Sequence, residues 1–193
     1  MSEVVQNKFC GEAHAIHTIG HSTRTIQDFI ELLNAHRIEL LVDVRRWPMS
    51  RRHPHFNRET LAVSLEANGI VYNWRQDLGG FRKADPNSLN STWRVTTFRA
   101  YADFMLTEKF ARIMRELEPL ANQRRIAIMC AEAVHWRCHR QLLADAFLVR
   151  GWNVQHIRDD SCHEHQLPNF AQVDATRIVY SGETAEDPNG KLF

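Results

Sequence analysis

The sequence is poor in lysine and has no long apolar run. Lysine occurs only at positions 8, 83, 109 and 191, so the 24 basic residues minus four lysines leave 20 arginines. No segment approaches the roughly 20 uncharged apolar residues that a membrane-spanning helix requires. The first 14 residues include Glu3, Lys8 and Glu12, which is unlike a secretory signal. These absences predict a cytoplasmic protein without a membrane partner.

Cysteine is also scarce, and no two cysteines form a Cys-x-x-Cys pair. The four cysteines stand at positions 10, 130, 138 and 162. In a cytoplasmic chain of this size, scattered cysteines are typical of reduced thiols, which serve as metal ligands or as a nucleophile, rather than of a disulfide framework.

The length and composition fit one globular domain. The chain has 193 residues, of which 44% are hydrophobic and 24% are charged, and its formal net charge is +1. We expect a single α/β domain over residues 1–193, with its core at about 13–182. The excess of arginine has two interpretations: GC-rich codon usage, or guanidinium groups that bind carboxylate or phosphate through paired hydrogen bonds.

Strand and helix patterns alternate along the chain. Strands are expected at residues 13–20, 39–45, 70–74, 125–130, 154–157 and 177–180. Helices are expected from Thr25 onward, at 58–68, at 98–120 with a break near Thr107 and an end at Pro119, and at 137–150. Long loops are expected at 46–57 and 78–92. This order predicts a three-layer α/β domain in which helices flank a mainly parallel sheet.

In such sheets, ligands bind beyond the carboxyl ends of the strands. The predicted strands place four segments at that edge, namely residues 21–22, 43–52, 79–82 and 130–140. We therefore expect one functional site built from these segments.

The segment from Cys130 to Arg140 carries the most reactive groups. Cys130 ends a predicted buried strand, Glu132 follows it, and Cys138, His139 and Arg140 open the next predicted helix. Free N–H groups at a helix start attract anions and lower thiol pKa values. We expect Cys130 or Glu132 to perform the covalent or acid–base step, with His139 and Arg140 in contact with the substrate. In the alternative, the cysteines are small core residues and Glu132 pairs with Arg140.

A metal site is a further interpretation of this segment. Cys130, Cys138 and His139 offer soft sulfur and nitrogen ligands, and either His21 or His135 would supply a fourth. Neighbouring residues on a helix point about 100° apart, which makes joint ligation by Cys138 and His139 awkward. The residues identify no particular cofactor. The Cys-His-Glu-His run at 162–165 also resembles a ligand cluster, but we expect a polar loop there.

Polar residues at two other strand ends complete the predicted site. His21 and Ser22 follow a glycine at a strand-to-helix turn; His21 is expected to transfer a proton, and Ser22 either contacts substrate or caps the helix. Asp43 lies in a buried apolar run, so its carboxylate needs a partner, either Arg45 or Arg82. Asp43 then acts as a general base or orients an arginine that binds the anion.

The loop after the second strand combines guanidinium groups with rings. Arginines at positions 45, 46, 51, 52 and 58 are interleaved with Trp47, His53, His55 and Phe56. This mixture suits phosphate contacts together with base stacking on single-stranded nucleic acid. In the alternative, it is a solvated loop whose arginines face water or pair with acids.

Taken together, the motifs resemble one protein family. In chain order they are Thr18-Ile19-Gly20-His21-Ser22, Val42-Asp43-Val44-Arg45, Pro48-x-Ser50, Leu78-Gly79-Gly80-x-Arg82, Cys130-Ala131-Glu132, Cys138-His139-Arg140, Val154-x-His156-Ile157, Glu164-His165-x-Leu167, Tyr180-Ser181-Gly182 and Leu192-Phe193. From about His17 to Phe193 this pattern resembles the domain-of-unknown-function family number 488. The resemblance implies a compact bacterial or archaeal α/β domain, but it implies no reaction, because the family name records none.

Three hypotheses about function follow. The first is an enzyme acting on a phosphorylated or nucleic-acid-derived anion, with an anionic small molecule or nucleic acid as its partner. In this hypothesis Arg45, Arg82 and Arg140 bind the anion, and His21 or His139 transfers the proton. The second is a non-catalytic nucleic-acid-binding module, and the third is a metal protein that uses Cys and His ligands.

Overall fold

The computed structural model describes residues 14–159 and 161–181. Cys10 and the terminal Leu192-Phe193 motif lie outside the described residues. Within the described ranges, no helix combines the length and the apolarity that a bilayer crossing requires.

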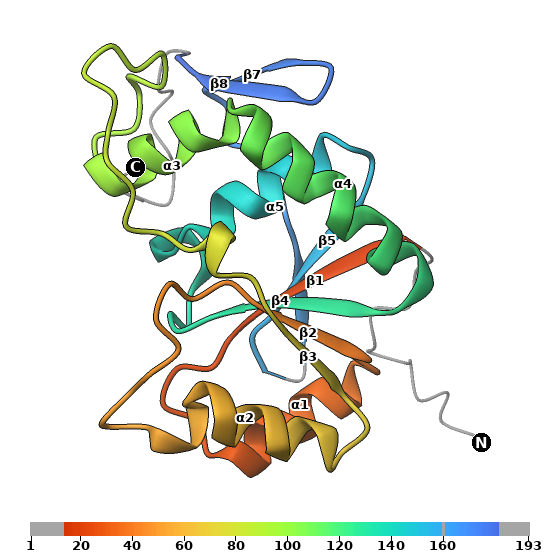
Figure 1. Cartoon of the computed structure of the whole chain (residues 1–193). Coiled ribbons are helices and arrows are strands. Elements are labelled where there is room, and N and C mark those ends of the chain that lie inside the picture. Colours follow the sequence, from red (N-terminus) through yellow and green to blue (C-terminus); the bar gives the residue numbers. More distant parts are fainter. Residues whose placement is uncertain (1–13, 160, 182–193) are drawn as a thin grey trace, which may run out of the picture.

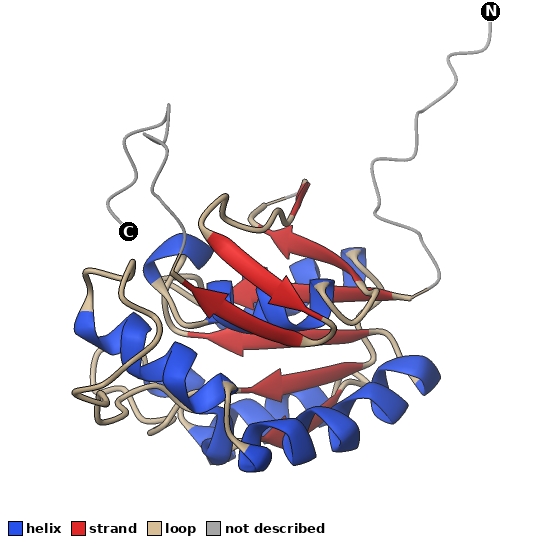
Figure 2. Cartoon of the chain, turned by 90° about the horizontal axis from the view of Figure 1, so that it is seen from above, coloured by secondary structure: helices blue, strands red, loops and turns tan. Residues whose placement is uncertain are grey.

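Six strands form the main sheet. They are β1 (Ala15–Gly20), β2 (Leu40–Asp43), β3 (Val71–Trp74), β4 (Ile126–Cys130), β5 (Asn153–Ile157) and β6 (Cys162–Glu164), in the order β3-β2-β4-β1-β5-β6. The first five strands pair in parallel, and β6 is antiparallel to β5. The strands run side by side through the molecule (Figures 1 and 2). The expected mainly parallel sheet is confirmed.

Helices cover both faces of this sheet (Figure 1). The helices α1 (Ile26–Ala35) and α2 (Arg58–Glu66) pack on one face, and α3 (Thr96–Met105), α4 (Glu108–Gln123) and α5 (Arg140–Leu148) pack on the other. Three short 3-10 turns precede or follow the loops: η1 (Pro54–Phe56), η2 (Gln76–Leu78) and η3 (His135–Arg137). We call the two faces the α1–α2 face and the α3–α5 face.

Helix ends follow the residues expected to cap them. The hydroxyl of Thr25 accepts a hydrogen bond from the backbone N–H of Asp28, 3.1 Å away, as an N-cap does. Thr107 caps α4 in the same way and separates it from α3, which confirms the expected break. Gly69 and Gly151 have φ of +74° and +85°, the left-handed geometry in which helices often end.

Pro119 does not end its helix, contrary to the prediction. It lies inside α4, which continues to Gln123. A proline removes one backbone hydrogen bond, and here the helix survives because Leu117 is fully buried and Leu120 packs against the same core. Tertiary packing of the apolar face therefore outweighs the local break.

The carboxyl-terminal part contains strands that the sequence patterns missed. The predicted polar loop at 162–165 contains β6, which pairs with β5. The expected strand at 177–180 is β8 (Arg177–Tyr180), but its partner is β7 (Ala171–Asp174), in a separate two-stranded antiparallel sheet. These short strands expose most of their residues, so apolar periodicity does not reveal them.

The sheet separates two apolar cores. Side chains of Ile128 and Cys130 in β4 point to the α3–α5 face, whereas those of Ala127 and Met129 point to the α1–α2 face. By the same alternation in β2, the side chain of Val42 points to the α3–α5 face and that of Asp43 points to the α1–α2 face. Side chains at the strand ends can therefore contact each other only when they point to the same face of the sheet.

Candidate functional site at the carboxyl edge of the sheet

Backbone hydrogen bonds hold the strand ends together at one edge. The N–H of His21 donates to the carbonyl of Cys130 over 3.0 Å, and the N–H of Ser22 donates to that of Ala131 over 2.9 Å. On the other side of β4, the N–H of Val44 donates to the carbonyl of Met129 over 2.9 Å. The segments after β1, β2 and β4 are thus neighbours, as the topology of a parallel sheet requires.

The predicted site residues divide between the two faces of this edge. Cys130, Cys138, His139, Arg140 and Arg82 surround the α3–α5 face. The residues His21, Asp43 and Arg45 pack instead with Phe56 and Tyr72 on the α1–α2 face. Two polar clusters result, one containing thiols and one containing a buried ion pair.

In the thiol cluster, two cysteines and a histidine meet. The Sγ of Cys138 lies 3.7 Å from Nδ1 of His139, and the Sγ atoms of both cysteines lie within 4.8 Å of each other and of a ring nitrogen of His139. Cys130, Cys138 and Cys162 are all free thiols. The ring of His139 packs beside that of Tyr101, with the centroids 5.0 Å apart, and under the backbone of Gly80.

The two thiols of the pair differ in acidity. The hydrogen bond with Cys138 and burial raise the pKa of Cys130 well above its ordinary value. Burial opposes ionisation of Cys138 as well, but the hydrogen bond from Cys130 and the neighbouring His139 and Arg140 lower the pKa of Cys138 well below its ordinary value. These opposite shifts favour Cys138 over Cys130 as the group of the pair that ionises.

Arg140 supplies positive charge next to the thiols. It is the first residue of α5 and only 1% exposed. Its Nη1 donates to the hydroxyl of Thr18 over 3.1 Å, and its Nη2 donates to the carbonyl of Glu132. The side chain of Glu132 belongs to an exposed residue and does not pair with Arg140 within the described residues.

Buried N–H groups around this cluster lack acceptors. Within the described residues, Nε of Arg82, Nε2 of His139 and Nε of Arg140 are buried and form no hydrogen bond. The guanidinium of Arg82 lies on the ring of Phe104, 3.2 Å from its centroid, and burial lowers its pKa. Because a buried donor without a partner costs about 1–3 kcal/mol, these groups favour an acceptor brought by a ligand.

On the α1–α2 face, Asp43 forms a saturated ion pair. Its carboxylate accepts from Nη2 of Arg45 at 2.6 Å, from Nε of Arg45 at 2.9 Å and from the hydroxyl of Tyr72 at 2.6 Å. Nη1 of Arg45 donates to the carbonyl of Phe56 over 2.9 Å. Arg45 and Arg82 are the two partners expected for Asp43, and in the structure Asp43 pairs with Arg45. The hydrogen bonds of this arginine hold the base of the 46–57 loop.

His21 is a neutral ring within this second cluster. Its Nδ1 donates to the carbonyl of Ser22 over 2.9 Å, so its Nε2 is left to accept from Arg45, 3.3 Å away. The ring stacks on Phe56 with a centroid distance of 4.2 Å. Burial, with a contribution from the charge of Arg45, lowers the pKa of His21 to about 4.

Acid is expected to destabilise the protein through His21. An unfolded histidine takes up its proton near pH 6.5, whereas folded His21 takes it up only near pH 4. The stabilisation is therefore complete above pH 6.5 and is lost as the pH falls towards 4, by about 3 kcal/mol for this group. Urea denaturation of the wild type and of His21→Gln at pH 7.5, 5.5 and 4.5 measures it. We expect a smaller acid loss in the variant, and equal losses would contradict this origin.

Exposed rings form a rim beside the thiol cluster. Trp47 and Phe81 are 58% and 75% exposed, and their ring centroids lie 5.2 Å apart. The guanidinium of Arg46 lies 5.8 Å from the Trp47 ring. Phe81 has φ of +59°, a left-handed conformation that is strained for an aromatic residue. Gly79 packs against Arg46, so the loops 46–57 and 79–92 meet at this rim.

Sequence reasoning missed several residues of the site. Tyr101 lies inside a predicted helix, where its spacing indicates only a core position. Tyr72 could have been found, because in a parallel pair with β2 it falls on the same face as Asp43. Ser22, expected to cap a helix or contact substrate, uses its backbone to tie β1 to Ala131, while Thr25 provides the cap.

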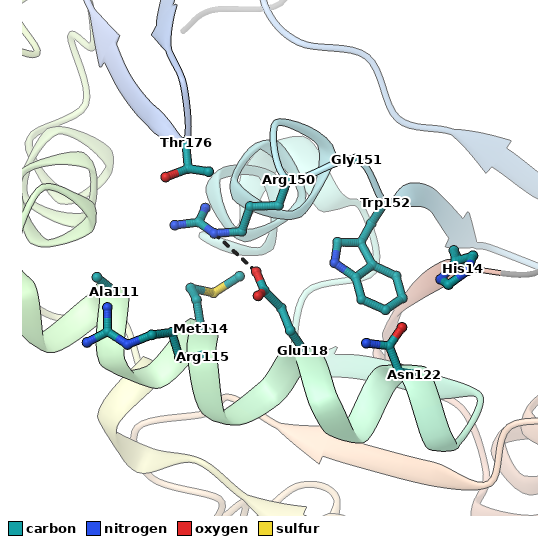
Figure 3. Close-up of a pocket in the computed structure, with 10 residues that line it drawn as sticks. All are labelled: His14, Ala111, Met114, Arg115, Glu118, Asn122, Arg150, Gly151, Trp152 and Thr176. Carbon is teal, nitrogen blue, oxygen red and sulfur yellow. Dashed lines mark ion pairs between the residues drawn. The ribbon is translucent and has the colours of Figure 1, made fainter.

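One pocket lies away from this edge. A cavity of about 550 Å³ lies near His14 and Trp152, just before β1 and β5 begin, and contains none of the predicted site residues (Figure 3). Its Arg150 pairs with Glu118 over 3.2 Å and donates to the carbonyl of Ala146 over 2.7 Å. The most conspicuous charged groups of this pocket are thus engaged with each other, at the opposite edge of the sheet from the thiols.

The chain matches one family model of known sequences. No curated protein and no solved structure matches the chain. A family model described as "Domain of unknown function DUF488" matches residues 25–147, which include both the Asp43–Arg45 pair and the thiol cluster. Because this match covers more than half of the sequence, the chain belongs to the DUF488 family.

Proposed function

We propose that the chain is a thiol-dependent enzyme acting on a phosphorylated or nucleic-acid-derived anion at the carboxyl edge of the sheet. The observation that carries this proposal is the buried thiol pair, in which the pKa of Cys138 is lowered beside His139 and Arg140. Such thiols are nucleophiles at neutral pH, and purely structural cysteines do not require this environment. Thiol chemistry also needs a reducing compartment, which supports a cytoplasmic location.

Each residue of the thiol cluster has a role in the proposed reaction. The Cys138 thiolate attacks the phosphorus of the substrate's phosphoryl group while the bond from phosphorus to the leaving oxygen breaks, and that oxygen takes up a proton; water then releases phosphate from the sulfur. Cys130 stabilises the thiolate of Cys138 before the attack. The unpartnered Nε–H groups of Arg82 and Arg140 bind the anionic group, and His139 contributes through its contact with Cys138. Glu132, exposed on the loop after β4, exchanges protons with solvent.

The second cluster is proposed to support the site rather than bind substrate. All three nitrogens of the Arg45 guanidinium already donate to Asp43, Phe56 or His21. His21 stays neutral over the physiological range because its pKa is lowered to about 4. In this role the ion pair holds the base of the loop that carries Trp47.

The rim favours a substrate that contains a base as well as a phosphate. Trp47 and Phe81 offer exposed ring faces, and Arg46 lies beside them. Nucleic acid strands bind proteins through this combination of stacking and guanidinium contacts, at about 1–3 kcal/mol per stacked base. The segment 44–58 contains five arginines and no acidic residue, which adds charge complementarity.

The pH dependence of alkylation tests the proposal. We expect iodoacetamide to label Cys138 with a midpoint well below pH 8, and a cysteine in a short unstructured peptide, as the control, with a midpoint of about 8.5. Site-resolved mass spectrometry gives both midpoints. The midpoint is compared rather than the rate, because burial slows labelling of Cys138 at every pH. Equal midpoints would overturn the role of Cys138.

Protection experiments distinguish the substrate classes. Inorganic phosphate and a short single-stranded oligonucleotide are added separately during labelling, to the wild type and to Arg82→Gln. We expect protection of Cys138 by at least one of them, and weaker protection in the variant. Oligonucleotide binding that persists in Cys138→Ser, together with an unshifted Cys138 midpoint in the wild type, would favour a non-catalytic nucleic-acid-binding module instead.

A specific distance favours a metal site as the second candidate function. The ligand atoms of Cys130, Cys138 and His139 all lie within 4.8 Å of one another, and the Cys138 Sγ to His139 Nδ1 distance is 3.7 Å. With metal–sulfur and metal–nitrogen bonds of about 2.3 and 2.0 Å, a tetrahedral zinc ion separates such ligands by about 3.5 Å. Metal that co-purifies without chelator, and chelator-accelerated labelling of both cysteines, would favour this candidate.

A further inference from the structure

A buried chain of hydrogen bonds runs from Arg140 away from the thiols. Nη1 of Arg140 donates to Thr18, whose Oγ1 lies 2.7 Å from Nδ1 of His156. Nε2 of His156 lies 3.0 Å from Nδ1 of His165. Nε2 of His165 lies 2.7 Å from Asp145, whose other oxygen accepts from the hydroxyl of Tyr180 over 2.7 Å. We call these residues, Thr18, His156, His165, Asp145 and Tyr180, the buried relay.

The charged ends fix the direction of the protons. Arginine can only donate and an ionised carboxylate can only accept. The Thr18 hydroxyl then donates to His156, His156 donates to His165, and His165 donates to Asp145, so that each ring carries one proton and every group is satisfied. Burial and the nearby His135 lower the pKa of His156, which fits a neutral ring.

The relay explains how a guanidinium can be buried without a carboxylate beside it. Arg140 is 1% exposed, and none of the ion pairs within the described residues involves it. Asp145 is fully buried as well, and burial raises its pKa, but the hydrogen bonds from His165 and Tyr180 favour its ionised form. Its nearest cationic counterpart along the hydrogen bonds is Arg140. Because aligned hydrogen bonds polarise one another in a low dielectric, the relay connects the two charges through three neutral groups.

The same histidines are a weaker candidate for a metal site. Ligand atoms of His135, His156 and His165 lie within 4.8 Å of one another. The rings of His135 and His156, however, are stacked with centroids 3.5 Å apart and planes only 7° apart. One ion cannot lie in both of these parallel planes, and the guanidinium at the end of the relay opposes a further positive charge.

We propose that the buried relay positions Arg140 at the start of α5, two residues after Cys138, with Asp145 as the remote counter-charge. The relay ends at a group that does not release its proton, so it orients and neutralises rather than conducts protons to the cysteines. This inference rests on the proposed thiol chemistry, because its effect is exerted through the charge that Arg140 presents to Cys138. Thr18, His156, His165 and Asp145 are accordingly positioning residues.

Removing the hydroxyl of Thr18 tests the proposal, because valine has nearly the same side-chain volume as threonine. Thr18→Val removes the hydroxyl that joins Arg140 to His156. We expect the alkylation midpoint of Cys138 to rise by roughly one pH unit, which is about tenfold less thiolate at pH values below the wild-type midpoint. Thr18→Ser keeps the hydroxyl and is expected to restore the wild-type midpoint. Thr107→Val, the same change at a helix cap far along the chain, controls for a loss of stability alone.

The outcomes separate this inference from the proposed function. An unchanged Cys138 midpoint in Thr18→Val, with a low midpoint in the wild type, overturns the relay and leaves the thiol chemistry standing. A high midpoint already in the wild type overturns the thiol chemistry itself. A shift in Thr107→Val equal to that in Thr18→Val also overturns the relay, because destabilisation would then suffice. Zinc binding that is lost in His156→Gln and His165→Gln would replace the relay by a metal site.

Discussion

Replacing Asp43 by asparagine is expected to lower the free energy of unfolding by about 3–5 kcal/mol. Asp43 has no exposed surface, and its carboxylate accepts from Arg45 and from the hydroxyl of Tyr72. The amide keeps the volume but loses the charge, so the Arg45 guanidinium is left buried without a counter-ion. Burial and the neighbouring carboxylate also raise the pKa of Tyr72, and this pKa should fall in the variant, while burial keeps it above the ordinary value. Urea denaturation and absorbance titration measure the two effects.

Asp77→Asn is the matched control for this experiment. Asp77 also pairs with an arginine, Arg75, over 2.9 Å, but it is 34% exposed and its partner keeps a second carboxylate, Glu116. A partly solvated pair of this kind contributes about 1 kcal/mol or less. A loss in Asp43→Asn no greater than that in Asp77→Asn would show that the buried pair is not the anchor of the 46–57 loop.

Adding one methyl group at Gly20 is expected to destabilise the protein by about 3 kcal/mol or more, at the upper end of overpacking effects. A Cβ atom at this position would overlap the carbonyl oxygen of Glu132 and lie 2.6 Å from its carbonyl carbon and 2.9 Å from Nη2 of Arg140. These neighbours are a backbone group and a buried guanidinium, so neither can move aside without breaking the hydrogen bond between them. Thermal and urea denaturation of Gly20→Ala measure the loss.

Gly80→Ala provides the comparison within the same site. Its added Cβ would approach Nδ1 of His139 to 3.4 Å, an ordinary contact with a side chain that can shift. We expect a loss below about 1 kcal/mol. If Gly20→Ala were as stable as Gly80→Ala, the loop after β4 would not pass over the end of β1 as closely as the structure has it.

Much of the fold could be predicted from the sequence because its elements have strong local signals. The continuous apolar runs of β2 and β4 indicate buried strands, and Thr25, Thr107 and Gly69 mark helix ends through their own chemistry. The local sequence signals fail where tertiary packing or strand pairing determines the secondary structure. Pro119 stays inside α4, and β6 and β7 have exposed residues and are recognisable only by their pairing partners.

The location of the site followed from topology, but its internal division did not. A parallel sheet brings the ends of β1, β2 and β4 to one edge whatever their residues are. Which face a residue joins depends on strand phase, and an error of one residue reverses it. The sequence therefore identifies His21, Asp43 and Cys130 as neighbours along the edge. It does not show that the sheet separates the thiol from the other two.

The relay was beyond sequence reasoning for another reason. Thr18, His156 and His165 lie far from one another along the chain, and a histidine in a strand usually indicates nothing more than a polar core position. Their alignment depends on the pairing of β1 with β5, where Thr18 and His156 are partners in register. Only the three-dimensional structure shows that pairing.

The position of Cys130 at the end of a central strand, with Cys138 packed against it, also bears on how such a protein can diverge. β4 is hydrogen-bonded on both sides, to β2 and β1, whereas the rim consists of the loops 46–57 and 79–92. Loops accept insertions and replacements that a central strand does not. Under the proposed function, descendants of one ancestor could therefore acquire new substrates by exchanging the rim while the sulfur atoms stay in place. Inherited chemistry and acquired selectivity would then reside in separate parts of the chain.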